Sequence, residues 1–191
     1  MPFIPLPLVI VAGGKSSRMG SDKALLPFGD FKTLTEYQLA RLQPFFERLH
    51  VSTKTRDKFD FDASFIEDNT TYTEHSPLVA LLSILEYVNK PVCILSVDTP
   101  FVTPEIFHAL ANNLKETTDA VIAVSPSSSH PLCAIYAPSM IAKIKHALQH
   151  HNHKMHHLLE QSKTHYVHFK EDAPFLNLNH PEDYAYAKER L

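Results

Sequence analysis

The sequence predicts an α/β protein built as a three-layer α/β/α sandwich around a mostly parallel sheet. Two observations carry this prediction. Short apolar runs alternate along the chain with longer segments of helical periodicity, which is typical of strand–helix–strand units. The first apolar run, residues 8–11, leads directly into a glycine-bearing loop, as in open α/β sheets that bind ligands at the carboxyl ends of their strands.

The same pattern predicts one domain. The chain has 191 residues, of which 44% are hydrophobic, and this length and composition suffice for a single globular core. No internal repeat, low-complexity tract or long linker divides the sequence. We therefore expect a single domain over residues 1–191.

The strands are predicted from hydrophobic and β-branched runs. Runs that are nearly unbroken hydrophobics, as expected of strands covered on both faces, lie at residues 8–11, 92–97 and 120–124. More mixed runs predict weaker strands at residues 49–52, 65–66, 132–136, 166–169 and 175–178. Helices are predicted at residues 34–46, 78–88, 105–114, 139–150, 155–161 and 182–191. Several helices follow a proline, which costs no hydrogen bond at the first helical position.

Charge and composition exclude several classes of protein. The net charge of −3 provides no basic surface for nucleic acid or for an anionic membrane. No uncharged apolar stretch has the 18 or so residues of a spanning helix, and the proline-interrupted start of the chain does not resemble a signal peptide. Cys93 and Cys133 lie in apolar runs, which favours buried thiols in a reducing compartment. We expect a cytoplasmic protein without nucleic-acid or membrane partners.

The loop after the first strand has the composition of a polyphosphate site. Three of the four glycines of the chain fall within residues 12–23. Glycine lets backbone N–H groups approach phosphate oxygens, and Lys15, Arg18 and Lys23 add positive charge. A flexible turn with solvated lysines is the alternative. A Walker A motif is excluded because it would need glycine at Val9, and a dinucleotide fingerprint is excluded because the first two glycines are adjacent.

A carboxylate is predicted opposite this loop. The apolar run 92–97 delivers Asp98 at its carboxyl end, and Pro100 then stops the strand. A carboxylate beside bound phosphates needs a cation between them, and Mg²⁺ typically takes one or two carboxylates together with phosphate oxygens. The alternative is that Asp98 caps the following helix, although Thr103 is available for that role.

These motifs resemble the molybdenum cofactor guanylyltransferases, a family of Rossmann-like nucleotidyltransferases within the nucleotide-diphospho transferase fold. Residues 11–23 read like the family signature L-A-G-G-x-S-x-R-M-G-x-D-K, and residues 177–183 read like N-x-N-T-P-E-D. Further matching segments follow in the same order, at residues 25–29, 67–68, 98–101 and 130–132. The resemblance spans nearly the whole chain.

The resemblance implies transfer of GMP from GTP to the terminal phosphate of molybdopterin, with release of pyrophosphate and a requirement for Mg²⁺. GTP and the molybdopterin acceptor are then the expected partners, together with other molybdenum cofactor biosynthesis proteins and molybdoenzyme chaperones. No protein nucleophile is needed, because positioning and charge neutralisation do most of the work in such transfers.

The resemblance also implies which residues form the site. The nucleotide would be bound by Val11, Ala12, Gly13, Gly14, Lys23, Asp68 and Asp98. Lys23 and Arg18 would supply charge at the phosphates, and Asp98 would hold the magnesium ion, so these three residues are the expected catalytic groups. Asn177 and Asn179 would contact the acceptor.

Some positions depart from the family pattern and keep alternatives open. Ser76 and Ala80 stand where the family has glycines before the central helix. Alternatives with the same fold are a cytidylyltransferase for molybdopterin or a sugar-phosphate nucleotidylyltransferase. An alternative of another class is a non-catalytic nucleotide-binding or metal-binding protein. Residues 130–132 and 177–183 favour the guanylyltransferase.

Histidine is unusually frequent, with 13 residues. If one helix held them, four would form a continuous face at i+4, i+3 and i+4 spacing, which could bind zinc, nickel or copper. These are His146, His150, His153 and His157. No cysteine or carboxylate completes such a site, so we predict a solvated face without a catalytic role. His130 and His180, by contrast, are expected near the pocket as polar walls or caps.

Overall fold

The structure is a computed structural model, and it describes residues 3–14, 21–72 and 76–191. Lys15 and Arg18 lie outside these ranges, so their predicted roles at the phosphates stay predictions.

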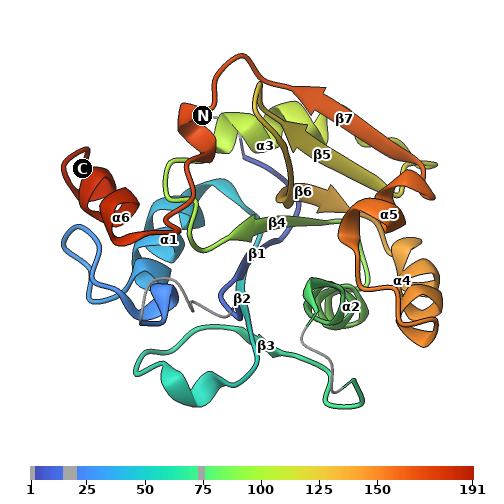
Figure 1. Cartoon of the computed structure of the whole chain (residues 1–191), viewed down its shortest axis with the longest axis horizontal. Coiled ribbons are helices and arrows are strands. Elements are labelled where there is room, and N and C mark those ends of the chain that lie inside the picture. The colour runs from blue at the N-terminus through green and yellow to red at the C-terminus, as the bar shows by residue number, and fades with distance from the viewer. Residues whose placement is uncertain (1–2, 15–20, 73–75) are drawn as a thin grey trace.

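A seven-stranded sheet with the order β3-β2-β1-β4-β6-β5-β7 forms the centre of the molecule (Figure 1). The strands are β1 (Leu8–Val11), β2 (Leu49–Thr53), β3 (Phe65–Glu67), β4 (Val92–Ser96), β5 (Ala120–Val124), β6 (Ser129–Tyr136) and β7 (Thr164–His168). Neighbouring strands pair in parallel, except that β6 runs antiparallel to both β4 and β5. The predicted mostly parallel sheet is confirmed.

Helices cover both faces of this sheet (Figure 1). They are α1 (Leu34–Leu42), α2 (Pro77–Val88), α3 (Pro104–Ala111), α4 (Met140–Gln149), α5 (Met155–Glu160) and α6 (Pro181–Lys188). Val9 of β1 packs into a cluster with α2, α4 and α5. Its neighbours Leu8 and Ile10 point the other way, toward clusters that contain α3 and α1. This alternation explains why β1 is apolar at every position, and it confirms the three-layer sandwich.

Prolines and caps set the helix boundaries. Ser76 caps α2, because its hydroxyl accepts a hydrogen bond from the Leu78 N–H at 3.2 Å. Thr103 occupies the N-cap position of α3, ahead of Pro104. The predicted helix 34–46 is shorter than expected: α1 ends at Leu42, and a single 3₁₀ turn that contains Pro44 follows it.

The strand predicted at residues 175–178 is wrong. The chain instead forms a 3₁₀ turn, η4 (Ala173–Phe175), whose second residue is Pro174. Beyond it, the Leu178 N–H donates to the Asp98 carbonyl at 2.9 Å, so this segment is held against the loop after β4 rather than in the sheet. Its apolar residues are buried for a different reason than predicted: Phe175 and Leu178 fill the core between η4, α3 and α6.

The continuous histidine face is also wrong, because its residues do not share one helix. Helix α4 ends at Gln149 and α5 begins at Met155, and between them His151 adopts the left-handed region with φ of 52°. The reversal places His157 on α5, whereas His146 and His150 lie at the end of α4. The His146 and His150 rings still lie together, with centroids 4.2 Å apart.

The cysteine prediction is confirmed. Cys93 on β4 and Cys133 on β6 are both buried free thiols, and burial raises the pKa of each thiol. Within the described residues, no helix is long and apolar enough to cross a bilayer.

Candidate active site

The candidate site lies at the edge of the sheet where β1 and β4 end. The Ala12 N–H donates to the Ser52 carbonyl at 2.8 Å, and the Val97 N–H donates to the Val11 carbonyl at 3.1 Å. The peptide groups of Val11 and Ala12 therefore belong to the sheet, and the loop proper begins at Gly13. A Cβ at Gly13 would lie 3.6 Å from the Lys54 backbone nitrogen, whereas one at Gly14 would meet open space.

The structure brings three of the predicted residues together into one polar cluster. The Lys23 ammonium donates to Asp98 Oδ2 at 2.7 Å and to Asn179 Oδ1 at 2.8 Å. The second carboxylate oxygen of Asp98 accepts from the Ser96 hydroxyl at 2.6 Å. The Lys23 and Asp98 side chains are only 13% and 17% exposed. Asp98 therefore does not cap α3, and the capping alternative is wrong.

Buried residues of α1 hold the Asp98 turn in place. The side-chain amide of Gln38, which is fully buried, donates to the carbonyls of Val97 and Thr99 on either side of Asp98, at 3.1 and 3.2 Å. Arg41 in turn donates to Gln38 Oε1 at 2.8 Å, and burial lowers the pKa of Arg41 to about 10. These polar residues stand on a helix and away from any motif, so no pattern in the sequence indicates their role.

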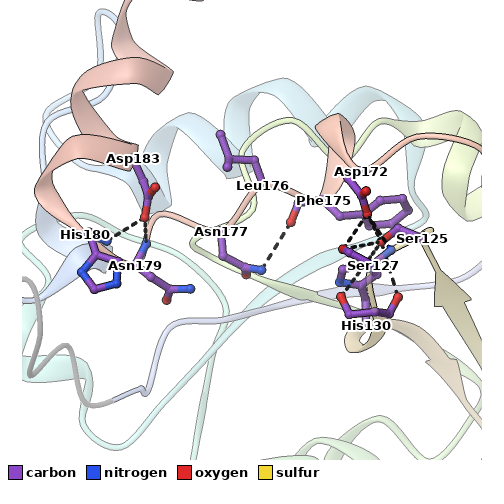
Figure 2. Close-up of a pocket in the computed structure, with 11 residues that line it drawn as sticks. Ser125, Ser127, His130, Asp172, Phe175, Leu176, Asn177, Asn179, His180 and Asp183 are labelled. Carbon is purple, nitrogen blue, oxygen red and sulfur yellow. Dashed lines mark hydrogen bonds between the residues drawn. The ribbon is translucent and has the colours of Figure 1, made fainter.

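The segment with the two asparagines is anchored at both ends (Figure 2). Asn177 Nδ2 donates to the Phe175 carbonyl at 3.3 Å. The N–H groups of Asn179 and His180 both donate to Asp183 Oδ2 at the start of α6, at 3.1 and 2.8 Å. With the Leu178–Asp98 bond described above, these contacts fix Asn179 beside the Asp98 carboxylate.

The oxygen atoms of this cluster suit a magnesium ion. Asp98 supplies a carboxylate and Asn179 an amide oxygen, and in the structure both bind a cationic group, the Lys23 ammonium. Among the described residues, no group of three histidine, cysteine or acidic side chains gathers as a metal site. One carboxylate with neutral oxygens fits Mg²⁺, which keeps its remaining positions for water and phosphate, better than it fits zinc.

A second part of the site lies at the ends of β2 and β3. Asp68 follows β3, and its N–H donates to the Thr53 carbonyl at 3.0 Å, beside the backbone that Gly13 contacts. Asp68 Oδ1 is buried without a hydrogen-bond partner among the described residues. Burial raises the pKa of Asp68, and the charge of Lys54 opposes this rise. A buried carboxylate oxygen without a donor is an acceptor whose hydrogen bond no described residue supplies.

Lys58, which was not predicted as a site residue, joins the two ends of the glycine loop. Its ammonium donates to the Ala12 carbonyl at 2.8 Å and to Asp22 Oδ2 at 2.6 Å. Asp22 Oδ1 accepts from the Ala24 N–H at 3.0 Å and so caps the 3₁₀ turn η1 (Lys23–Leu25). Lys58 therefore stabilises the turn that presents Lys23. It comes from a loop between β2 and β3 that carries no motif.

On the other side of Asp98 lie two neighbouring pockets that share His130 and Asn177. One, of about 240 Å³, is lined by Ser96, Asp98 and His130 among others. The other, of about 350 Å³, includes Ser125, Asp172 and His180 and is drawn in Figure 2. His130 and His180 both line this pocket, which agrees with their prediction as polar walls.

A hydrogen-bonded group closes the far wall of the larger pocket (Figure 2). The Ser125 hydroxyl lies 2.5 Å from Asp172 Oδ1 and 2.9 Å from His130 Nε2. The hydrogen bonds from Ser125 and Ser127 lower the pKa of Asp172. Burial lowers the pKa of His130, although the Asp172 charge opposes this. Ser125 and Asp172 were not predicted, and the only signal was the run of serines that follows β5.

The fold and the site together define a nucleotidyltransferase: a glycine loop after β1, a carboxylate after β4, and two neighbouring pockets beside that carboxylate. Residues 8–166 match the model of the MobA-like NTP transferase domain, and the chain belongs to this family. The resemblance read from the motifs is thereby confirmed.

Named relatives agree with this family. The chain is 37% identical to a molybdenum cofactor guanylyltransferase of Campylobacter jejuni (strain RM1221), and the match covers 100% of both proteins. It is 30% identical to the protein of that name from Helicobacter pylori (strain G27), over 97% of this chain and 93% of the relative. The crystal structure of molybdopterin-guanine dinucleotide biosynthesis protein A from Archaeoglobus fulgidus superposes with a TM-score of 0.83, at 24% identity, over 97% of this chain and 98% of that one. This last likeness concerns the fold.

Proposed function

We propose that this protein transfers GMP from GTP to the terminal phosphate of molybdopterin and releases pyrophosphate. One observation carries the proposal: the Lys23, Asp98 and Asn179 cluster lies between the glycine loop on one side and the paired pockets on the other. A transferase must bring the phosphates of its donor and its acceptor together at a site that balances their charge, and this cluster is such a site. The relatives that match over nearly their full length are named molybdenum cofactor guanylyltransferases, and this name indicates the nucleotide and the acceptor.

In this proposal the nucleotide lies along the β1 and β2 side. The unpartnered oxygen of Asp68 accepts hydrogen bonds from the nucleoside, and the open backbone at Gly14 lets the triphosphate approach the loop. Lys23 balances Asp98 in the ligand-free protein, and the same ammonium can pair with phosphate oxygens. Arg18 would add charge beside it.

Magnesium is the proposed cofactor, held by Asp98 with the amide oxygen of Asn179. When bound, it neutralises charge on the phosphates of the donor. The chain's own contribution is positional: Gln38 and the Leu178 N–H fix the Asp98 turn, and Asn177 and Asn179 direct the acceptor toward it. The attacking oxygen belongs to the acceptor phosphate, so no side chain has to act as nucleophile.

Further partners follow from the proposed activity. Other molybdenum cofactor biosynthesis proteins would deliver the acceptor, and molybdoenzyme chaperones would receive the product. We place this exchange in the cytoplasm, where the two buried thiols stay reduced.

The direct test uses purified protein, Mg²⁺, molybdopterin and each of GTP, CTP, ATP and UTP in turn. We expect a guanine dinucleotide product by mass spectrometry and release of pyrophosphate with GTP. Thermal unfolding provides a second reading, because a ligand at 100 times its Kd stabilises the folded state by about 2.7 kcal/mol. Preferred use of CTP, or of a sugar phosphate as acceptor, would replace the proposal with one of its alternatives.

A further inference from the structure

The hydrogen-bonded group around His130 determines which ring nitrogen carries the proton. A serine hydroxyl has a single hydrogen, and Ser125 lies within hydrogen-bond distance of both Asp172 Oδ1 and His130 Nε2. Hydrogen bonds from Ser125 and Ser127 lower the pKa of Asp172 and keep it ionised, so its carboxylate can only accept; the Ser127 hydroxyl and N–H donate to it at 2.6 and 3.1 Å. The Ser125 hydrogen therefore points to Asp172. His130 Nε2 must then be the donor to the Ser125 oxygen.

A neutral imidazole with its proton on Nε2 has a lone pair on Nδ1. Burial lowers the pKa of His130, which favours this neutral form at pH 7. No described residue hydrogen-bonds to Nδ1, and Nδ1 is not among the buried atoms left without a partner. Nδ1 is therefore an acceptor that a ligand can reach.

The ring is also held in a fixed plane. It stacks on Phe175 with centroids 4.4 Å apart and an angle of 9° between the rings. Phe175 is itself 3% exposed and belongs to the core. A fixed ring with a fixed tautomer presents its acceptor in one direction, which is what selective recognition of a hydrogen-bond donor requires.

Asp98 and His130 suit two different parts of the acceptor, its phosphate and its uncharged part. Asp98 and His130 come from different strands, β4 and β6, and both line the 240 Å³ pocket. A phosphate needs cations and N–H or O–H donors, and Lys23 lies beside Asp98. A lone pair repels phosphate oxygens, so the space beside His130 suits an uncharged group that carries N–H donors.

We propose that His130 recognises the heterocycle of the acceptor: Nδ1 accepts a hydrogen bond from a ring N–H or an exocyclic amino group, while the acceptor phosphate lies toward Asp98. This inference rests on the proposed function and adds a specificity-determining residue and an orientation for the acceptor. A pterin has the N–H groups that such a site takes. Ser125 and Asp172 are positioning residues, because they act through the imidazole.

The tautomer is tested by ¹⁵N NMR of the histidine rings in the whole protein, with His130 assigned by its absence from His130→Gln. We expect a protonated Nε2 and an unprotonated Nδ1. A soluble pterin without phosphate should shift the Nδ1 resonance, and inorganic phosphate should not. A proton on Nδ1, or an equal shift with inorganic phosphate, would overturn the proposal. This measurement needs no turnover, so it remains decisive even if guanylyl transfer to molybdopterin is not observed.

Two isosteric variants give the kinetic test. Glutamine places its amide near the Nε2 position and can still reach Ser125, whereas asparagine places its amide near Nδ1 and can still accept a hydrogen bond from the ligand. We expect His130→Gln to raise the KM for molybdopterin about tenfold, the effect of one lost hydrogen bond, and His130→Asn to raise it less. The KM for GTP should stay at the wild-type value in both. The reverse order, or wild-type acceptor KM in His130→Gln, would contradict the proposal.

Discussion

At the scale of single residues, Asp98 is held through both its side chain and its backbone. Both of its carboxylate oxygens accept hydrogen bonds, and the backbone on either side of it is bound by Gln38. A carboxylate fixed in this way has no freedom to move toward a ligand. The fixed carboxylate therefore sets the position of any cation that Asp98 shares with a triphosphate.

Asp98→Asn should abolish most of the activity while it leaves the fold intact. Asparagine keeps the size of the side chain and one oxygen acceptor, but it removes the charge that would hold magnesium. We expect guanylyl transfer to fall by about two orders of magnitude or more, as when a key electrostatic stabiliser is lost. Transfer rates and circular dichroism of the pure variant measure the two effects. Ser96→Ala, which removes one hydrogen bond to the same carboxylate, should lose less than tenfold, and near-wild-type turnover by Asp98→Asn would contradict the proposed mechanism.

Lys58 provides a second prediction at this scale. Lys58→Met should free the ends of the glycine loop and weaken the cap on the turn that presents Lys23, because both bonds of the ammonium are lost. We expect the KM for GTP to rise about fivefold, with kcat changed less, and Lys58→Arg to restore part of the affinity. Lys90→Met is the matched control, because Lys90 pairs with Glu47, which lies ahead of β2 and away from the loop. Equal effects of the two methionine variants would show that Lys58 has no specific role at the loop.

At the scale of elements, Asp119 joins three of them. It lies just before β5, and its carboxylate accepts from the Ser139 hydroxyl ahead of α4, from Lys143 on α4 and from the Lys163 N–H ahead of β7, at 2.6, 2.6 and 2.7 Å. Burial by itself raises the pKa of this carboxyl, but the three hydrogen bonds outweigh it and hold the pKa below its ordinary value. The junction therefore depends on an ionised aspartate.

Asp119→Asn should destabilise the protein in a pH-dependent way. Because the pKa is lowered in the folded state, the stabilisation is fully present above the unfolded value of about 3.9 and is lost as the pH falls through the folded value. We expect a loss of about 2 kcal/mol in the free energy of unfolding at pH 7, measured with urea. The difference from wild type should stay constant between pH 7 and about pH 5 and shrink below about pH 4. Asp60→Asn, at an exposed position, should show neither effect.

The α4–α5 pair carries the histidine-rich surface and gives a prediction of its own. His146, His150 and His157 line a pocket of about 610 Å³ between these helices, far in sequence from the strand ends. Replacement of these three and His153 by glutamine should leave guanylyl transfer near wild type and remove any retention on a Ni²⁺ column. A tenfold or greater loss of transfer in the folded variant would assign this surface a role in catalysis.

The whole molecule shows which parts of the site the sequence could predict. Strand ends are visible as breaks in apolar runs, and parallel strands bring their carboxyl ends to one edge. The meeting of Lys23 with Asp98, 75 residues apart, was therefore predictable. Asn179 could be placed only through the family resemblance, because the strand predicted before it does not exist.

The contacts that were missed depend on side chains rather than on strand order. Ser125 and Asp172 are 47 residues apart, and they meet because β7 and η4 return the chain to the end of β5. Nothing in the composition near Asp172 distinguishes it from a surface aspartate. Gln38 and Lys58 likewise act through a particular rotamer and distance, and a pattern of hydrophobic residues contains no information on either.

Because β6 runs against its neighbours, its first residues, rather than its last, reach the edge where β4 ends. The β5–β6 hairpin thus carries His130 to Asp98, while residues 8–68 supply Gly13, Lys23 and Asp68 from the opposite side. Under the proposed function, residues 8–68 recognise the donor, and the chain from β5 to the start of α6 recognises the acceptor. These two stretches meet at the Asp98 turn. Exchange of the stretch from β5 to the start of α6 between family members, which moves His130, Asp172 and Asn179 together, should therefore change the acceptor that is used and preserve the choice of nucleotide.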